Sequence, residues 1–468
     1  MHYRGHPFYA CSAPLSRLEL LIGDLVPRRT APLVLLDGGG EGLSQLASTR
    51  LDALGYSDVS ILVGGCAGWQ AAGGELFSGV NVPSKAFGEF VEHHYDTPRI
   101  SAQELKRLLE AGEKMVIVDS RPFEEYQRMS IPGGIDVPGA ELAWRVPGLA
   151  PDAATLIVVN CAGRTRSIIG CQSLRNAGVP NRVVALKDGT MGWELAGFAC
   201  ERGAQRLAPS PTDEAKARAG TAADKVAKRF GVKFTDADTV REWQRDASRT
   251  LYLLDVRTRQ EFEQAHIAGS RHAPGGQLVQ ASDEYVGVRN ARVVLIDPER
   301  VRAVMTASWL NQMGWNDVYV LSSFDALPIA SGPRGAKIDL PKWQMVQEPE
   351  GTVLDFSTSL RFHHRHIPGA WWVVRSRLSE AFHRIGPAGS ITLSSEDGVL
   401  AHLAAPEVAA LWRDAEVRVL EGGNAAWFAR GGAEETGIER ATTTRPADGD
   451  GGSAGWWRNR GRCRRAAW

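Results

Sequence analysis

Cys161 stands where an apolar run ends and a small, basic loop begins. The run Leu156–Asn160 predicts a strand buried on both faces, and Ser167–Ala177 predicts a helix. The thiol is therefore expected at the carboxyl end of a strand, beside a helix N-terminus whose amides favour an anion. Arg164 and Arg166 add two positive charges that should lower the pKa of the thiol. This arrangement predicts a nucleophilic thiolate.

The alternative for Cys161 is structural, since a cysteine at the end of a buried strand is often a small, inert hydrophobe. An inert thiol has no need of two arginines and a glycine around it. The loop as a whole therefore favours an activated nucleophile.

Three motifs in this part of the chain carry a family resemblance. They are Cys161-x4-Arg166, Asp119-Ser120-Arg121 upstream, and Asp188-Gly189-Thr190-Met191-Gly192-Trp193 downstream. In this order they resemble the rhodanese family of sulfurtransferases. The resemblance implies an α/β domain in which Cys161 accepts sulfane sulfur from an anionic donor such as thiosulfate. The resulting persulfide would pass its sulfur to cyanide, a small thiol or a protein acceptor, without a cofactor.

The resemblance also assigns roles around the cysteine. The loop amides would hold the persulfide, the two arginines would bind donor charge, and Asp119 and Arg121 would support the loops nearby. The expected binding residues are Ala162, Gly163, Arg164, Thr165, Arg166 and Ser167.

Other chemistries remain open for this loop. Dual-specificity phosphatases of the same architecture use Cys-x5-Arg, which would require arginine at position 167, where this chain has Ser167. Phosphatase or arsenate reductase activity is thus disfavoured. A second alternative is a persulfide carrier or sensor, or a scaffold whose repeats bind proteins.

Repetition extends over nearly the whole chain. An Asp-x-Arg block followed by Ile-Pro-Gly or a relative recurs, as does an apolar strand followed by Gly-Gly and Trp. The fold class predicted is α/β: tandem rhodanese-like domains, each a mostly parallel sheet flanked by helices. The expected units are a truncated repeat at 1–80, full repeats at 96–205, 230–330 and 336–436, and a disordered tail at 440–468. The linker before residue 230 is expected to hold a helix from Asp213.

Only the second repeat has a thiol at the nucleophile position. Approximate alignment places Gly38 there in the first repeat and a serine, near Ser395, in the fourth. The third repeat reads Asp297-Pro298 and is expected to have a shortened loop that lacks one amide donor. All three are predicted to be inactive in sulfur transfer.

Cysteines and histidines give no further site. Six cysteines are scattered without a CxxC pair, so neither zinc nor a disulfide framework is indicated. His266 and His366 precede Ile-x-Gly in two repeats, so repetition explains them, and no metal site is predicted. Cys171 lies ten residues after Cys161, more than one helical turn from the loop, and is expected in the core.

Composition sets outer limits on function. The chain has 468 residues, enough for roughly three or four domains. Its 54 basic and 54 acidic residues leave no charge excess for a polyanion. There is no bilayer-length apolar stretch and no signal-peptide core. The sequence thus predicts a cytoplasmic protein that binds neither nucleic acid nor membrane.

Overall fold

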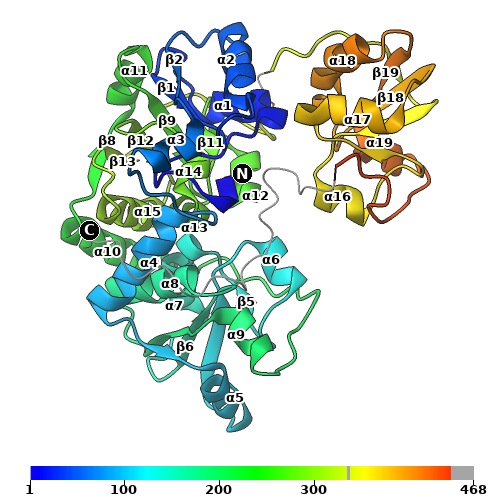
Figure 1. Cartoon of the computed structure of the whole chain (residues 1–468). Helices are drawn as coiled ribbons and strands as arrows, with labels where there is room; N and C mark the ends of the chain where they lie inside the picture. Colours follow the sequence, from blue (N-terminus) through cyan, green and yellow to red (C-terminus); the bar gives the residue numbers. More distant parts are fainter. Residues whose placement is uncertain (1, 335–337, 444–468) are drawn as a thin grey trace.

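The computed structural model describes residues 2–334 and 338–443. Within them the chain forms four α/β units, of which three contain a five-stranded, all-parallel sheet (Figure 1). The first unit, in blue, and the third, in green, lie together on one side of Figure 1. The second, in cyan, lies below them. The fourth, in yellow and orange, lies beside the first, to which it is joined by ion pairs of Arg50 with Glu407 and of Arg375 with Glu19. No helix in the described residues has the length and apolar character needed to cross a membrane.

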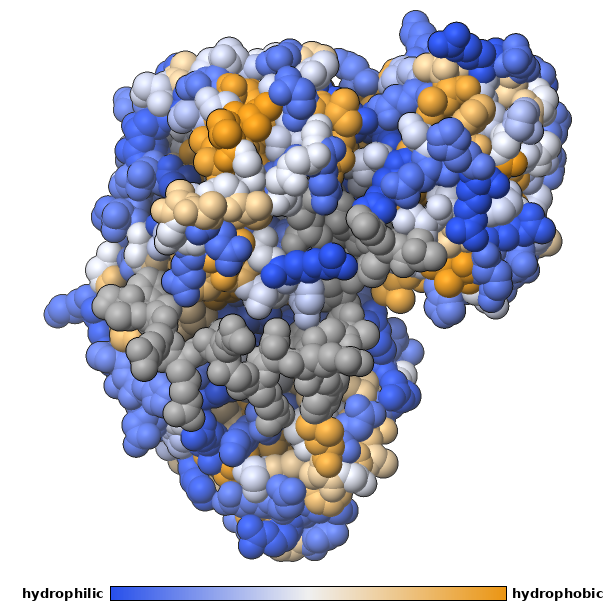
Figure 2. Space-filling view, in the orientation of Figure 1, coloured by the Kyte–Doolittle hydropathy of each residue, from blue (hydrophilic) through white to orange (hydrophobic). Residues whose placement is uncertain are grey.

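The first repeat has two parallel strands in one small sheet. Hydrophobic side chains gather on the surface over this repeat (Figure 2), where Val34, Leu46 and Val63 are exposed. Its elements are α1 Leu18–Leu25, β1 Leu33–Leu35, α2 Leu43–Ala53, β2 Val59–Ile61 and α3 Gly65–Ala71, followed by the connecting helix α4 Val82–Tyr95.

The second repeat holds the candidate nucleophile. Its strand order is β3-β7-β6-β4-β5, which places β6 in the middle of the sheet. The elements are β3 Arg99–Ile100, α5 Ala102–Glu110, β4 Met115–Asp119, α6 Phe123–Arg128, β5 Ile135–Asp136, α7 Leu142–Leu149, β6 Leu156–Asn160, α8 Thr165–Asn176, β7 Val183–Leu186 and α9 Gly189–Leu195. All five residues of β6 are buried, as its β-branched composition predicts.

The helix expected in the next linker is present as α10 Asp213–Arg229. Thr212 caps it by accepting a hydrogen bond from the Ala215 amide, and acidic residues occupy its first turn. This helix packs against both the second and the third repeat through α7 and α15 (Val301–Gln312).

The third repeat has the same strand order, read as β8-β13-β12-β9-β11. Its elements are β8 Lys233–Thr235, α11 Ala237–Arg245, β9 Leu251–Asp255, α12 Arg259–Gln264, β10 His266–Ile267, β11 Arg271–His272, α13 Gly275–Gln280, α14 Ser282–Tyr285, β12 Arg292–Ile296, α15, β13 Val318–Leu321 and β14 Ile329–Ala330.

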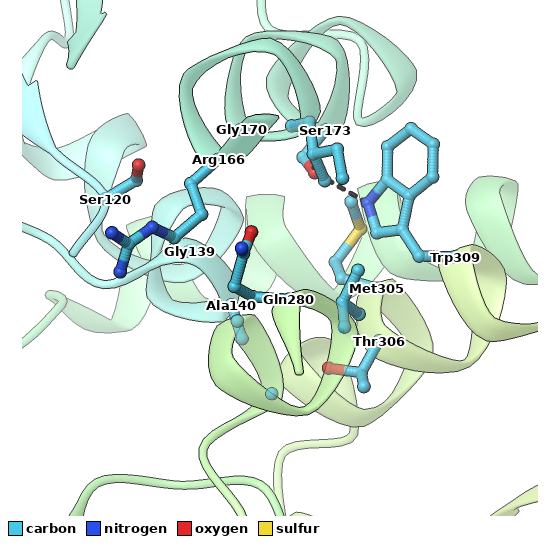
Figure 3. Close-up of a pocket in the computed structure, with 14 residues that line it drawn as sticks. Ser120, Gly139, Ala140, Arg166, Gly170, Ser173, Gln280, Met305, Thr306 and Trp309 are labelled. Carbon is cyan, nitrogen blue, oxygen red and sulfur yellow. Dashed lines mark hydrogen bonds between the residues drawn. The ribbon is translucent and has the colours of Figure 1, made fainter. Parts of the chain in front are cut away.

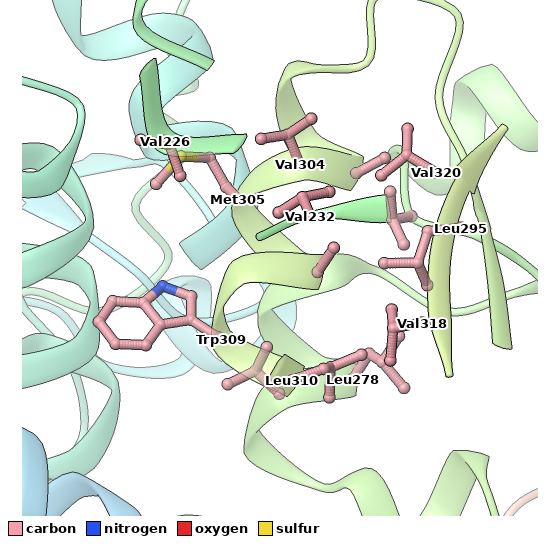
Figure 4. Close-up of a cluster of buried hydrophobic side chains, with 14 of the residues drawn as sticks. Val226, Val232, Leu278, Leu295, Val304, Met305, Trp309, Leu310, Val318 and Val320 are labelled. Carbon is pink, nitrogen blue, oxygen red and sulfur yellow. The ribbon is translucent and has the colours of Figure 1, made fainter. Parts of the chain in front are cut away.

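The core of the third repeat continues into its neighbours. Figure 4 shows Val226 of α10 beside Met305 of α15, with Val318 and Val320 of β13 at the right of the view. The same buried cluster includes Ile168 of α8. Burial of this apolar area fixes the second and third repeats against each other.

The fourth repeat again has five parallel strands, in the order β15-β19-β18-β16-β17. Its elements are β15 Met345–Val346, β16 Thr352–Asp355, α16 Ser359–His364, β17 Trp371–Trp372, α17 Leu378–Ile385, β18 Ser390–Ser394, α18 Val399–Leu411, β19 Glu416–Leu420 and α19 Gly423–Ala429.

The tail differs in part from its expected disorder. Ala441 forms a bridge with Trp372, and the Thr442 amide donates to the Trp372 carbonyl, so residues 440–443 extend beside β17. Residues 444–468, the rest of the predicted tail, lie outside the described residues.

Candidate active site

Cys161 follows the last residue of β6, in the centre of the second sheet. Helix α8 begins at Thr165, two residues earlier than the sequence indicated. The loop between strand and helix is therefore short, and the cysteine lies beside the first turn of the helix. Cys161 is 1% exposed, so the sulfur is enclosed by protein.

The carbonyl groups of the loop are fixed from one side by the start of α9. The Thr190 amide donates to the Cys161 carbonyl at 2.9 Å, and the Met191 amide donates to the Ala162 carbonyl at 3.1 Å. Gly189 permits this close approach: its φ is +56°, and a Cβ there would lie 2.2 Å from the Cys161 carbonyl oxygen. The downstream Asp-Gly-Thr motif thus orients the nucleophile loop.

The amides of the loop have no such partners. In the part of the chain that the structure describes, no protein acceptor pairs with the N–H groups of residues 162–167. Successive unpaired amides beside a helix N-terminus form a cradle for an anion. All six predicted binding residues contribute their backbone to this segment.

Asp119 and Arg121 support the residue that precedes the cysteine. Arg121 Nε and Nη2 donate to the two oxygens of Asp119, each at 2.8 Å. The same carboxylate accepts from Asn160 Nδ2 at 2.8 Å. Burial opposes the charge on Arg121, but the hydrogen bonds and charge of Asp119 outweigh it and raise its pKa. This buried network fixes the end of β6 beside the end of β4.

Arg166 points across the loop toward α6 and the third repeat. Its Nη1 and Nη2 each donate to Glu125 at 2.8 Å, and Nη1 also lies 3.4 Å from Gln277 Oε1. Burial disfavours the guanidinium charge, yet Glu125 raises the pKa of Arg166 above its ordinary value. Arg166 is therefore held by a carboxylate in this structure.

Arg164 is held on the other side by the connecting helix α4. Its Nε donates to Glu92 at 3.0 Å, and its Nη2 lies 2.9 Å from Glu89. Gly88 of the same helix packs so closely that a Cβ there would lie 2.8 Å from Thr165 Cγ2. Arg164 remains 39% exposed, so it is the more accessible of the two loop arginines.

The guanidinium charges of Arg121 and Arg166 interact with the Cys161 sulfur. A Cys161 thiolate is among the negative charges that raise the pKa of both Arg121 and Arg166. The two guanidinium groups therefore act electrostatically on the same atom.

The third repeat shows how this cradle holds an anion. Asp255 pairs with Ile296 as Asp119 pairs with Asn160, so Asp297 occupies the position of Cys161. Asp297 Oδ2 accepts from the Arg302 amide at 2.8 Å and the Ala303 amide at 3.4 Å. Its Oδ1 accepts from Arg302 Nη2 at 2.8 Å.

The third loop is not shortened, contrary to the sequence prediction. Arg302 follows Asp297 by the same five positions that separate Arg166 from Cys161, and each helix begins four positions after the site residue. Pro298 needs no deletion, because the amides that bind the Asp297 carboxylate belong to Arg302 and Ala303, which lie after the proline.

The first repeat also differs from the approximate alignment. The Asp37 carbonyl accepts from the Cys66 amide, as the Cys161 carbonyl accepts from Thr190, so Asp37 and not Gly38 occupies the site position. In the fourth repeat Ser395 is confirmed near the site, where its hydroxyl accepts from the Ala401 amide at 3.4 Å. Only the second repeat combines a thiol with this loop.

The third repeat closes one side of the loop. Trp309 Nε1 donates to Ser173 Oγ at 2.8 Å, and Arg166 lies on the other side of the cavity at this contact (Figure 3). The cavity measures about 30 Å³, enough for a single water molecule. Two hydrogen bonds join the repeats here: Arg166 of the second repeat donates to Gln277 of the third, and Arg302 of the third repeat donates to Glu141 of the second.

Several residues at the site were missed by sequence reasoning. Glu125 could have been found, because Asp-x-Arg-x3-Glu recurs as Asp255, Arg257 and Glu261, and Glu261 binds Arg302 as Glu125 binds Arg166. Glu92 and Gln277 carry no such signal, since they come from a linker helix and another repeat.

The other cysteine and histidine candidates, Cys171, His266 and His366, lie in environments that fit a structural role. Cys171 is fully buried, and burial raises the pKa of its thiol to about 12. His266 and His366 each bond through Nδ1 to the carbonyl of a phenylalanine four residues earlier, at 2.8 Å. Within the described ranges, no group of three or more His, Cys, Asp or Glu side chains is arranged for a metal ion.

Comparison with known proteins extends these observations. The family model of the rhodanese-like domain matches residues 101–196 and 236–323. A crystal structure of thiosulfate sulfurtransferase from Pseudomonas aeruginosa is 48% identical, with a TM-score of 0.89, over 94% of this chain and 85% of that chain. An HTH-type transcriptional regulator of Mycobacterium tuberculosis is 42% identical over 106 residues, which is 22% of this chain and only 45% of the regulator.

Proposed function

This chain belongs to the rhodanese family of sulfurtransferases, and from that membership we propose that it transfers sulfane sulfur through a persulfide on Cys161. The observation that carries the proposal is the amide cradle of residues 162–167, which has no protein acceptor among the described residues. In the third repeat two of the matching amides, those of Arg302 and Ala303, already bind a carboxylate. The second repeat has the Cys161 thiol at the position of that carboxylate, and its anion would be the thiolate or persulfide formed during the reaction.

The proposed reaction has two displacement steps. The Cys161 thiolate attacks the outer sulfur of a donor such as thiosulfate, an S–S bond forms to the enzyme, and sulfite leaves with the electron pair of the donor's S–S bond. A thiophilic acceptor such as cyanide then attacks the outer sulfur of the persulfide, forms thiocyanate and releases the thiolate. The chain's own groups suffice for both steps, so no cofactor is part of the proposal.

The cradle assists by holding the negative charge of the thiolate and of the persulfide. Amides fixed by the fold before reaction give electrostatic stabilisation without reorganisation, of order 10²- to 10³-fold per donor in comparable oxyanion sites. Arg121 and Arg166 act on the sulfur as charges while their carboxylate partners fix them in place. Arg164, the more exposed, is the one placed to contact an arriving anionic donor.

The test is turnover with thiosulfate and cyanide, read as thiocyanate. The matched variants are Cys161→Ser and Cys171→Ser, which remove thiols from the same repeat, one at the loop and one in the core. We expect the first to abolish turnover and the second to retain it. Sulfur uptake without release to cyanide would instead support a carrier or sensor, and equal turnover in both variants would refute the proposal.

A further inference from the structure

A second buried acid lies close to the site and has no role in the chemistry above. Asp136 ends β5, at the edge of the second sheet, and is 4% exposed. Its Oδ1 is buried and has no hydrogen-bond partner among the described residues. An unpaired buried carboxylate oxygen is costly, so its presence calls for an explanation.

The other repeats show what this position does. In each of the three five-stranded sheets, the residue equivalent to Asp136 lies opposite the aspartate that ends the neighbouring strand. The pairs are Asp136 with Asp119, His272 with Asp255, and Trp372 with Asp355. These positions are equivalent in register, so the side chains leave the sheet in equivalent directions.

Both counterparts bond to the same backbone group. Trp372 Nε1 donates to the Ser357 carbonyl at 2.9 Å, and His272 Nε2 lies 3.0 Å from the Arg257 carbonyl. Each acceptor lies two residues after the strand-ending aspartate. In the second repeat the equivalent acceptor is the carbonyl of Arg121, and the side chain in the donor position is Asp136.

An aspartate can donate only when it is protonated. The charges around Asp136 favour that form, because Asp119 and Glu124 are negative. Of the nearby cations, Arg121 is bonded to Asp119, and Arg145 is bonded to Glu141 at 2.6 Å.

Burial first, and then the charge of Asp119, raise the pKa of Asp136 to about 8. Tyr126, which also faces Asp136, donates its hydroxyl to the Gly134 carbonyl. The Arg206 carbonyl accepts from the Asp136 amide, but the Arg206 side chain bonds to the Gly134 carbonyl and to Glu201. Among the described residues, no group therefore supplies the Asp136 carboxylate with a hydrogen bond.

We propose that Asp136 is a positioning residue that works as the neutral acid, donating a hydrogen bond to the Arg121 carbonyl and fixing residues 119–121 beside the nucleophile loop. This rests on the function proposed above. The link to the loop is short: the Ser120 amide and hydroxyl both donate to the Asn160 carbonyl, at 2.9 and 2.8 Å. Asn160 immediately precedes Cys161.

Loss of the proton reverses the interaction. The carboxylate would face a carbonyl oxygen and the Asp119 carboxylate, and both contacts are repulsive. The 119–121 segment would then move from Asn160, and the sulfur would lose its alignment. Sulfur uptake is therefore expected to decline as pH rises through the titration of Asp136.

The experiment follows persulfide formation with thiosulfate in single turnover across pH, because the charge of thiosulfate is constant in this range. Asp136→Asn keeps the size and offers an amide donor that does not titrate, and Asp136→Leu removes the donor at every pH. We expect an alkaline decline in the wild type, its absence in Asp136→Asn, and in Asp136→Leu a rate that is slow throughout and has no alkaline decline. An identical alkaline decline in wild type and Asp136→Asn would overturn the proposal.

An infrared difference spectrum between wild type and Asp136→Asn gives a second readout that does not depend on sulfur transfer. The carbonyl stretch of a protonated carboxylic acid should be present in the wild type at neutral pH and lost at alkaline pH. Its absence would refute the neutral acid even if no sulfur were transferred. A band that titrates while the uptake profile stays unchanged would refute the positioning role alone.

Discussion

A single methyl group at Gly189 should disable the site by displacing the nucleophile loop. In the structure a Cβ at this position would lie 2.2 Å from the Cys161 carbonyl oxygen and 2.8 Å from the Ala162 carbonyl carbon. Both are backbone atoms, which cannot rotate away as a side chain could. In Gly189→Ala, the loop must therefore move as a unit away from α9.

The size of the effect follows from this geometry. Relief of the contact needs a shift of about 1 Å, and a misplacement of that size can cost about 10²-fold in rate. Alanine at the positive φ of Gly189 also costs roughly 1–2 kcal/mol in stability, whatever its neighbours. The rate loss is specific to this site, whereas the strain is not.

Gly112→Ala is the matched control. Gly112 lies in the same repeat with φ +67°, and a Cβ there meets nothing within 4 Å. Both variants should lower the midpoint of thermal unfolding, but only Gly189→Ala should slow persulfide formation, by about 10²-fold. Equal uptake rates in the two variants would refute the claim that α9 holds the loop in its reactive shape.

Three further predictions test neighbouring parts of the account. Asp297→Asn removes one of the four carboxylates that pair with the fully buried Arg302 and should cost about 1.5–3 kcal/mol in denaturant unfolding, with sulfur uptake retained; unchanged stability would contradict the ion pair. Cys171→Ala should leave uptake at one sulfur per chain, and peptide mapping that finds sulfur on Cys171 in the wild type would contradict its assignment to the core. In the wild type Asp136 keeps its proton to about pH 8 when folded but ionises near its ordinary value when unfolded, so stability falls as pH rises between them. Asp136→Asn should flatten that fall by about 1.4 kcal/mol per pH unit, and equal slopes would count against a neutral Asp136.

The sequence carried the local features of the site well. The buried strand before Cys161 and the helix after it follow from β-branched composition and from periodicity, which act over a few residues. Repetition then extended the α/β architecture to other units. The resemblance also singled out Asp119 and Arg121 as supporting residues, and the structure has them bonded to each other.

Contacts between repeats could not be predicted in the same way. Arg164 pairs with Glu92 of the connecting helix, and Arg166 meets Gln277 of the third repeat, 111 positions away. Nothing in the local pattern specifies such partners, because they depend on how whole domains pack. The error at Asp297 has a different cause: without the strand register, Pro298 suggested a deletion that the structure does not contain.

The most direct test of sulfur transfer is the intact mass of the protein before and after thiosulfate, for wild type and Cys161→Ser in parallel. The account predicts a gain of one sulfur atom on the wild type only, and its loss after cyanide is added. A gain on Cys161→Ser, or no gain on either protein, would contradict a persulfide at Cys161.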